Sequence, residues 1–439
     1  MARHARQLKH ESASRGLARR HLLRRHDPPC RGPAPGCGTN GKTDELIESA
    51  QPDGDEIVPD HVRPDLPDPL VAPDPIDGPR PDRPTRPAYT VALVLGGGNA
   101  LGAYQAGAYE ALAQADLPID WVVGASTGAI SGAIICGNPP EQRLERLRAY
   151  WRPGGGDDRH GTSNPLEDMR RTMDVAMRFA MGQPQVFAPR IASALWQGAF
   201  GNETPNSLYD TAPLAATLAT LVDFDRLNLA PIRFSLTAVD LESGEDLVFD
   251  SRRDAIGPDH VRASGAFLPL FPPIEIDGRL CADSGLSANL PIDVVLADPP
   301  GGPTLCIAID LLPRRAPRPR SLGEIAERAQ DLVFACQSRR AIAGWKRVYD
   351  LQAAAATDAT GPDAIGSQPV TLIHLAYAAQ EPEVCGKAFD FSPGSIAHRW
   401  HQGRRDMDAI IASLRSGAIA VDRPGLTVHA FDGERPMPG

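Results

Sequence analysis

Ser126 stands at the centre of a Gly-x-Ser-x-Gly pentapeptide, a spacing that can expose a serine hydroxyl as a nucleophile. Residues 120–123 (DWVV) ahead of it have the composition of a short buried strand, and residues 127–136 behind it (TGAISGAIIC) that of a small-residue helix. Between a strand and a helix, Gly124 and Gly128 permit a sharp nucleophile elbow that lifts the hydroxyl clear of the backbone. The pentapeptide alone would indicate only a loop, but in this context it predicts a nucleophilic Ser126.

A glycine-rich stretch ahead of the serine can bind an anion. Residues 90–95 (TVALVL) form a near-continuous apolar strand that leads into Gly96–Gly98, and a helix is expected over residues 103–115. Backbone N–H groups of a glycine-rich turn at a helix N-terminus bind anions, and the helix dipole favours the negative charge. Beside a serine nucleophile, the simplest such anion is the oxyanion of a tetrahedral acyl intermediate.

A third stretch carries an aspartate that can face an active site. Asp283 ends an expected strand (CAD), and Ser284–Gly285 open the turn that follows, ahead of residues 286–291 (LSANLP). A carboxylate at the junction of a strand and a turn can be held towards a cleft, where it can take a proton as a general base.

These three stretches, in this order, resemble the patatin-like phospholipase family over residues 90–312. The resemblance implies a three-layer α/β/α sandwich with a mostly parallel central sheet. It also implies a serine acyl-ester hydrolase with a Ser–Asp dyad and no catalytic histidine. Carried over residue by residue, it implies a nucleophile at Ser126, a general base at Asp283 and an oxyanion hole at Gly97, Gly98 and Asn99.

Three residues depart from the family pattern. Asn99 stands where the family has a third loop glycine, Leu101 where it has an arginine or lysine, and Ser284 where it has the glycine after the aspartate. Asparagine tolerates a positive φ better than any residue but glycine, so we expect the loop to keep its shape. None of the three departures removes a catalytic group.

The glycine-rich loop has two competing interpretations as a nucleotide site. A dinucleotide fingerprint would require a glycine where Leu101 stands, and a phosphate-binding Walker loop would require Gly-Lys-Ser or Gly-Lys-Thr where Gly102 is followed by Ala103. Nucleotide binding is therefore disfavoured.

A Ser–acid–His triad is the alternative to the dyad, because such triads follow this order along the chain. Histidines follow the serine at His160, His260, His374, His398, His401 and His429. His374 suits the role best, since it ends an expected strand and Asp310 can orient it. Histidines inside strands are more often packed than catalytic, so Asp283 remains the preferred base.

Composition divides the 439 residues into three parts. Residues 1–88 hold fifteen prolines, a basic stretch and then an acidic one, and we expect them to be disordered because they cannot bury enough apolar surface. Alternating strand and helix patterns predict a catalytic domain over residues 89–312. A mainly helical C-terminal extension packed on the core is expected over residues 313–439, as in a bacterial subfamily of the patatin-like proteins.

The hydrophobic pattern predicts seven strands and two long helices. Strands are expected near 90–95, 120–124, 232–239, 246–249, 273–282 and 304–310, with a last strand at 370–375. Long helices are expected over 321–350 and from the region of residue 390 to residue 415.

Apolar residues at helical spacing lie between the serine and the central strands. They are Leu166, Met169, Met173, Met177 and Ala180, followed by Phe187, Ile191, Leu195, Trp196 and Phe200. A flexible, Met- and aromatic-lined pair of helices can form a lid or an acyl tunnel over the serine. The alternative is ordinary core packing of an amphipathic helix.

Charge and cysteine usage narrow the choice of partners. The net charge of −10 argues against nucleic acid. The seven cysteines show no CxxC or Cys/His ligand spacing, so we expect no metal, no cofactor and no disulfide framework. No apolar run reaches the ~20 residues of a membrane span. We therefore expect a cytoplasmic protein, with peripheral contact to a membrane as a further expectation.

The function expected from the sequence is hydrolysis of lipid acyl esters, of the phospholipase A type. Two alternatives stay open. The first is an intracellular polyhydroxyalkanoate depolymerase, because some relatives of the resembled family act on such polyesters. The second is a lipid- or acyl-binding protein that kept the pocket and lost turnover, which Asn99, Leu101 and Ser284 motivate.

Overall fold

The fold is given by a computed structural model, which describes residues 87–152, 165–190, 206–356, 368–378 and 383–431. The disorder expected over residues 1–88 concerns a segment of which all but the last two residues lie outside the described part.

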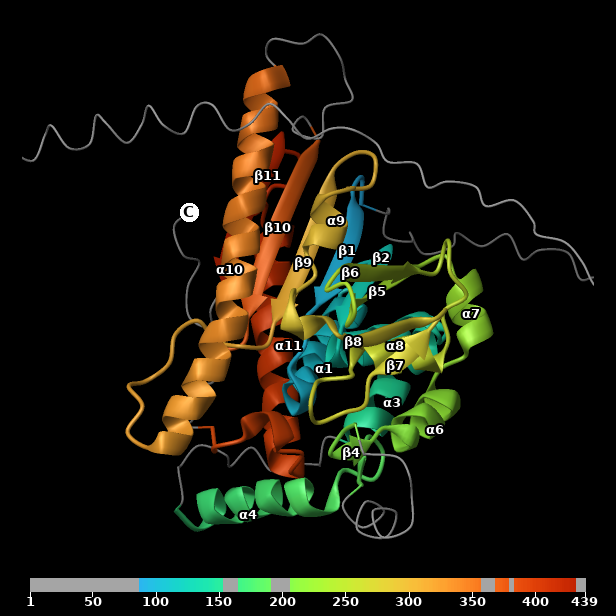
Figure 1. Ribbon diagram of the computed structural model, residues 1–439. Helices are drawn as coiled ribbons and strands as arrows, with labels where there is room; N and C mark the ends of the chain where they lie inside the picture. Colours follow the sequence, from blue (N-terminus) through green and yellow to red (C-terminus); the bar gives the residue numbers. More distant parts are fainter. Residues whose placement is uncertain (1–86, 153–164, 191–205, 357–367, 379–382, 432–439) are drawn as a thin grey trace, which may run out of the picture. The chain divides into compact units, whose positions relative to one another are not determined.

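One mixed sheet runs through the described chain in the order β11-β10-β9-β1-β2-β5-β8-β7, with β6 paired to β5 (Figure 1). Its strands are β1 (Thr90–Leu95), β2 (Trp121–Ala125), β5 (Arg233–Asp240), β6 (Asp246–Asp250), β7 (Ile274–Ile276), β8 (Arg279–Asp283), β9 (Thr304–Asp310), β10 (Pro369–Ala376) and β11 (Gly425–Phe431). Neighbours from β11 to β5 are parallel, whereas β6, β7 and β8 pair in antiparallel fashion. The mostly parallel α/β sheet confirms the expected fold class.

The single strand expected over residues 273–282 is wrong, because this segment is a hairpin of β7 and β8. Asp277 and Gly278 join the two strands, and both have positive φ, at 50° and 77°. Positive φ at both central residues defines a type I′ turn, and Asp-Gly is one of the pairs that favour it. The turn chemistry therefore outweighs the continuous strand pattern.

Helices flank the sheet. The α-helices are α1 (Ala103–Gln114), α2 (Thr127–Cys136), α3 (Pro140–Trp151), α4 (Pro165–Met181), α6 (Ala212–Leu221), α7 (Phe224–Leu229), α8 (Pro258–Ser264), α9 (Asp293–Leu296), α10 (Leu322–Ala356) and α11 (Pro393–Arg415). Short 3-10 turns are η1 (Asn99–Gly102), η2 (Ser284–Leu286) and η4 (Lys387–Phe389), and β3 (Ala188–Pro189) pairs with β4 (Tyr209–Asp210). Among the described helices, none is both long enough and apolar enough to cross a membrane.

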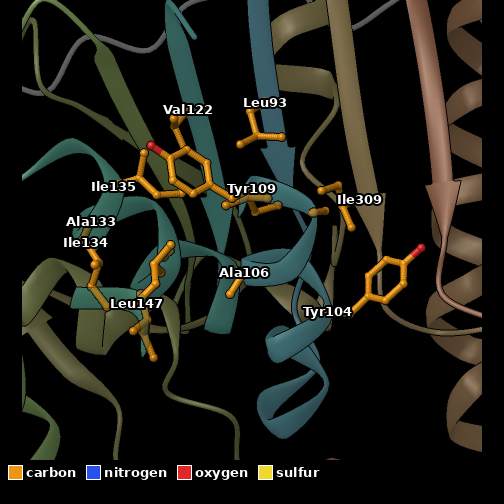
Figure 2. Close-up of a cluster of buried hydrophobic side chains, with 14 of the residues drawn as sticks. Leu93, Tyr104, Ala106, Tyr109, Val122, Ala133, Ile134, Ile135, Leu147 and Ile309 are labelled. Atoms are coloured by element: carbon orange, nitrogen blue, oxygen red, sulfur yellow. The ribbon is translucent and has the colours of Figure 1, made fainter. Parts of the chain in front are cut away.

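Two hydrophobic cores lie on opposite faces of the sheet, because successive side chains of a strand point to opposite sides. Leu93 of β1 points into a core shared with α1 and α2, which Figure 2 shows around Tyr109. The next residue, Val94, points into the second core, with Leu296 of α9 and Tyr349 of α10. Helices on both faces of the sheet give the three layers expected from the sequence.

The C-terminal helix α11 crosses α1 at two glycines. A Cβ atom on Gly107 would lie 1.9 Å from the carbonyl oxygen of Trp400, and one on Gly403 would lie 2.0 Å from that of Tyr104. The absence of side chains therefore lets the two backbones touch, which joins the C-terminal region to the helix that follows the glycine-rich loop.

The sheet extends further than expected at its C-terminal edge. Residues 370–375 were expected as the last strand, but β11 follows α11 and pairs in parallel with β10, with Leu372 opposite Val428. Residues 313–439 thus add two strands as well as helices. The division of the chain at residues 312 and 313 stays a prediction.

Candidate active site

Parallel pairing brings the glycine-rich loop and the serine to the same edge of the sheet. In the register of β1 and β2, Leu95 lies opposite Gly124. Because the two strands run in the same direction, Gly96 and Ser126, which follow them, leave from the same edge.

Strand pairing also brings the aspartate beside the serine. Ala125 pairs with Thr237 of β5, and Asp283 pairs with Ala238, the next residue of β5. Ser126 follows Ala125 directly, so it lies at the level of Ala238, with Asp283 on the other side of that strand. The distant serine and aspartate are thus neighbours through one shared strand.

The elbow holds Ser126 in a strained conformation. Its φ of 53° and ψ of −121° are uncommon for a residue with a side chain. Its amide donates to the buried Ser264 hydroxyl at 2.9 Å. A Cβ on Gly128 would lie 2.1 Å from the Leu95 carbonyl oxygen, and one on Gly124 would lie 2.6 Å from the α2 backbone, so both flanking positions require glycine.

Asp283 is a buried carboxylate beside the serine. Only 2% of it is exposed, and its Oδ1 accepts the Gly285 amide at 2.7 Å. Burial raises the pKa of Asp283 to about 6, although hydrogen bonds from the Ser126 side chain and the Gly285 amide act to lower it. A carboxylate with this pKa is largely ionised at neutral pH and is a stronger base than an exposed aspartate.

Asn289 clamps the glycine-rich loop. Its carbonyl oxygen accepts the Gly97 amide at 3.0 Å, and its side-chain Nδ2 donates to the Gly97 carbonyl at 3.1 Å. On the other side, Gln105 donates to the Gly96 carbonyl at 2.8 Å. The Gly97 amide is therefore engaged within the fold, whereas Gly98 and Asn99 border the cavity described below.

The two polar departures from the family pattern fit the local backbone. Asn99 has a φ of 51°, in the left-handed region that asparagine tolerates. Ser284 is buried, and its hydroxyl lies 2.8 Å from that of Thr237 on β5. Both side chains are thus accommodated without moving the loop or the aspartate.

At the third departure, a buried arginine from the C-terminal helix supplies a cation near the loop. Leu101 is fully buried, and the guanidinium of Arg399 donates to the carbonyl oxygen of Ala100 beside it at 3.4 Å. Arg399 also pairs with Glu383 at 2.9 Å. Burial alone would raise the pKa of Glu383, but the attraction of Arg399 holds this pKa at about 2. The pair is therefore charged at neutral pH and ties α11 to the start of η1.

Ser126 and Asp283 open into one apolar cavity of about 440 Å³. Its apolar lining comes from Ile130, Phe179, Val186, Leu214, Phe267, Leu270, Phe271, Leu312, Phe334 and Phe389. Besides Ser126 and Asp283, the polar residues Asn99, Thr127, Thr211, Asn289 and Gln330 also border it. Within the described residues no three His, Cys, Asp or Glu side chains are arranged to hold a metal ion. A cavity of this kind fits a largely hydrocarbon ligand with one polar group at the serine.

The apolar residues expected to form a lid or part of the core do neither as a group. Residues 165–181 form the expected helix α4, but the methionines point to neither the cavity nor the core and are well exposed. Phe179 of the same helix lines the cavity, and Phe187 is fully buried. The remaining members of the group, Ile191, Leu195, Trp196 and Phe200, lie outside the described residues.

The histidine considered for a triad lies elsewhere. His374 Nε2 is 3.2 Å from Asp310 Oδ2, so the expected orienting pair does form. Neither residue borders the cavity that holds Ser126.

The fold and the site together define a class: an α/β protein with a serine elbow and a buried aspartate at the edge of a mostly parallel sheet. A family model described as patatin-like phospholipase matches residues 93–296, and a second, described as patatin phospholipase, matches residues 360–418. Residues 93–296 therefore form a patatin-like phospholipase domain.

Several individual proteins are similar to parts of the chain. An uncharacterised NTE family protein of Mycobacterium tuberculosis is 27% identical over 219 residues, which cover 50% of this chain and 30% of the relative. The neuropathy target esterase sws of Drosophila persimilis is 49% identical over 47 residues, or 11% of this chain and 3% of the relative. The matched region is therefore less than a third of these relatives. The crystal structure of VipD from Legionella pneumophila aligns over 74% of this chain and 67% of its own, at 15% identity and a TM-score of 0.35.

Three residues at the site escaped sequence reasoning. Asn289 lies a few residues after the expected aspartate, which was the available signal for it. Ser264 lies within the region that resembles the family, but it is distant along the chain from both Ser126 and Asp283. Arg399 gave none, because nothing in its local sequence indicates that it reaches a loop some 300 residues earlier.

Proposed function

We propose that this protein is a serine hydrolase that acts on lipid acyl esters through a dyad of Ser126 and Asp283. The observation that carries the proposal is the meeting of these two residues at one apolar cavity, on either side of strand β5. The patatin-like phospholipase domain supports the general activity.

In the first step, the Ser126 hydroxyl loses its proton to the Asp283 carboxylate while its oxygen bonds to the ester carbonyl carbon. The elbow holds the oxygen at the cavity, and the buried carboxylate is a strong enough base to assist. The protonated Asp283 then gives the proton to the departing alcohol, which leaves an acyl group on Ser126.

The tetrahedral intermediate carries a negative charge that needs hydrogen-bond donors. The loop supplies them as backbone amides at Gly98 and Asn99, which border the cavity at the start of η1. Gly97, the other residue assigned to this hole, positions its neighbours instead, because its amide donates to Asn289.

In the second step, water attacks the acyl carbon. Asp283 takes one proton from the water, the carboxylic acid leaves, and the proton returns to the Ser126 oxygen. One carboxylate thus serves both halves of the reaction, and no histidine is required.

The lining of the cavity favours a long acyl chain over a short polar one. Phenylalanines and aliphatic side chains surround the serine, and burying apolar chain against them contributes about 0.8 kcal/mol for each CH₂ group. A hydroxyalkanoate polyester carries a polar ester in every repeat, so it would leave more carbonyl groups without partners in this cavity.

Labelling with a fluorophosphonate probe tests the proposal. The wild-type protein should label at Ser126, Ser126→Ala should not, and the control Ser243→Ala, at an exposed serine of a loop, should label as the wild type does. Absence of labelling in the wild type would favour a binding protein without turnover. A panel of long-chain p-nitrophenyl esters, phospholipids and hydroxybutyrate oligomers then separates the ester classes, and preferred turnover of the oligomers would favour the depolymerase.

A further inference from the structure

Helix α4 carries an apolar face that points away from the rest of the domain. Four of the seven methionines of the chain lie on it, and together with Leu166 they are 57–68% exposed: Met169, Met173, Met177 and Met181. At about 100° per residue these five side chains fall in one stripe. Exposed methionines are uncommon, and a whole stripe of them calls for a function.

The opposite side of α4 is anchored to the domain and reaches the cavity. Val175 is buried, and the Phe179 ring, which lines the cavity, lies 4.3 Å from the Phe389 ring. Arg171 pairs with Glu383 at 3.0 Å and with Asp390 at 3.1 Å. The helix is therefore held in place by one side while the methionine face stays open.

A basic segment adjoins the same cavity. Residues 313–320 (PRRAPRPR) contain four arginines and no acid, and they follow Leu312, which lines the cavity. The segment leads into α10, whose Gly323 adjoins Cys385, while the next residue, Gly386, adjoins Val175 of α4. The first turns of α10 and helix α4 lie at the same end of the domain in Figure 1.

Within the described residues, the acidic side chains at this end pair with groups other than the side chains of Arg314, Arg318 and Arg320. On α4, Arg170 pairs with Asp174 at 3.0 Å, and at the start of α10 the buried Asp331 pairs with Lys387 at 2.8 Å. Arg314, Arg318 and Arg320 are exposed, and no salt bridge is recorded for them within the described chain. An apolar face beside exposed arginines is complementary to the surface of an anionic phospholipid bilayer.

We infer that the methionine face of α4 and the exposed side chains of Arg314, Arg318 and Arg320 form a docking surface for anionic phospholipid bilayers. This inference rests on the proposed function for its purpose, since a docked α4 places Phe179 and the cavity against the phase that contains the acyl chains. The flexible methionine side chains enter the acyl boundary of the bilayer, and the arginines contact lipid phosphates.

Co-sedimentation with vesicles tests the docking surface directly. The vesicles contain three parts phosphatidylcholine and one part phosphatidylserine, and every variant carries Ser126→Ala so that the lipid stays intact. Replacing Met169, Met173, Met177 and Met181 with glutamine should weaken binding about threefold for each partly buried side chain. Replacing Arg314, Arg318 and Arg320 with glutamine should weaken it about fivefold for each charge and remove most of its salt dependence.

Two variants serve as matched controls. Leu229→Gln removes an apolar side chain that is 86% exposed on α7, and glutamines at Arg339, Arg340 and Arg347 remove three charges from the exposed middle of α10. Both should bind vesicles as the parent does. A fourfold Met→Leu variant keeps the apolar face and should bind at least as tightly, which answers the objection that the glutamine variant is misfolded.

Several outcomes would overturn the inference. Unchanged binding of the glutamine variant at the methionines would exclude α4 as the contact. A second such outcome is a parent protein that does not bind vesicles but forms a dimer in light scattering. If the same glutamine substitutions dissociated that dimer, the methionine face would be an interface between two copies of the chain. If the parent does not bind vesicles and the glutamine substitutions lower the melting temperature, another part of the chain covers the methionine face. Because turnover is absent throughout, vesicle binding is judged independently of the hydrolase.

Discussion

Two buried carboxylates end strands of the same sheet, and each meets a different partner. Asp310 ends β9 and lies 3.2 Å from His374 Nε2, while Asp283 ends β8 and lies beside Ser126. Both carboxylates are at most 2% exposed. Of these four residues, only Ser126 and Asp283 border the apolar cavity.

A suitable pair of residues therefore does not by itself make a site. Asp310 accepts the Leu312 amide on Oδ1, and its carbonyl accepts the Tyr377 amide, so this aspartate and His374 fasten the ends of β9 and β10. Asp283 accepts one backbone amide as well, but its partner serine sits on a strained elbow that faces space for a ligand. Access to a reactant and the strained elbow, rather than burial, distinguish the candidate dyad.

The largest expected effect follows from removing the nucleophile. Ser126→Ala should lower kcat/KM for a long-chain p-nitrophenyl ester by at least ~1,000-fold, because the residual rate comes only from binding and the oxyanion donors. The melting temperature should stay close to that of the wild type, since the Ser126 amide and its bond to Ser264 remain. Activity within a few-fold of the wild type would reject the serine assignment.

Removal of the base should have the next largest effect. Asp283→Asn should lower kcat by at least ~100-fold, the scale of a lost general base. The pKa of Asp283 is raised on folding, so this group favours the folded state at low pH and loses that contribution as pH rises through about 6. The amide variant should therefore keep or raise the melting temperature at neutral pH, and a large loss of stability would indicate a structural role instead.

The pH dependence sharpens the comparison between the carboxylates. Asp283 must be ionised to accept the serine proton, so kcat/KM should fall as pH drops through about 6, the value to which burial raises its pKa. Below that value the fall should be about tenfold per pH unit, with a plateau above it. A pH–rate profile between acid and neutral pH checks this, and a profile without an inflection near that value would contradict Asp283 as the base.

Loosening the glycine-rich loop should have an intermediate effect. Asn289→Ala removes the side-chain donor to the Gly97 carbonyl, so the adjacent amides lose part of their alignment. We expect kcat to fall about tenfold with little change in KM, less than the loss of an oxyanion donor itself. Asn138→Ala is the matched control. It removes a buried asparagine that lies outside the cavity and donates hydrogen bonds to two backbone carbonyls, so it should lower stability without this drop in kcat.

The smallest expected effect belongs to the second carboxylate pair. His374→Gln should leave kcat/KM within about twofold of the wild type, because His374 does not border the cavity that holds Ser126. Steady-state kinetics on the same ester provide the measurement. An inactive His374→Gln beside an active Asp283→Asn would reverse the comparison and reject the dyad.

The local geometry of the candidate site follows from short stretches of the sequence. Gly124 and Gly128 are needed within a few residues of Ser126, and Asn99 tolerates the left-handed backbone of its own turn, so short-range patterns carry this information. The alternation of strands and helices likewise predicted a mostly parallel sheet. Local sterics and hydrogen bonds act between neighbours in the chain, which is why their signals survive in the sequence.

Which distant residues meet depends on the complete fold. The clamp of Asn289 on Gly97, the reach of Arg399 to Ala100 and the pairing of β11 with β10 depend on register and helix packing across the whole domain. The methionine stripe of α4 had a clear helical period, but the period cannot tell which side of a helix the domain covers. Burial is a property of the assembled fold, because the surface that a side chain loses to its neighbours depends on residues far away in the chain.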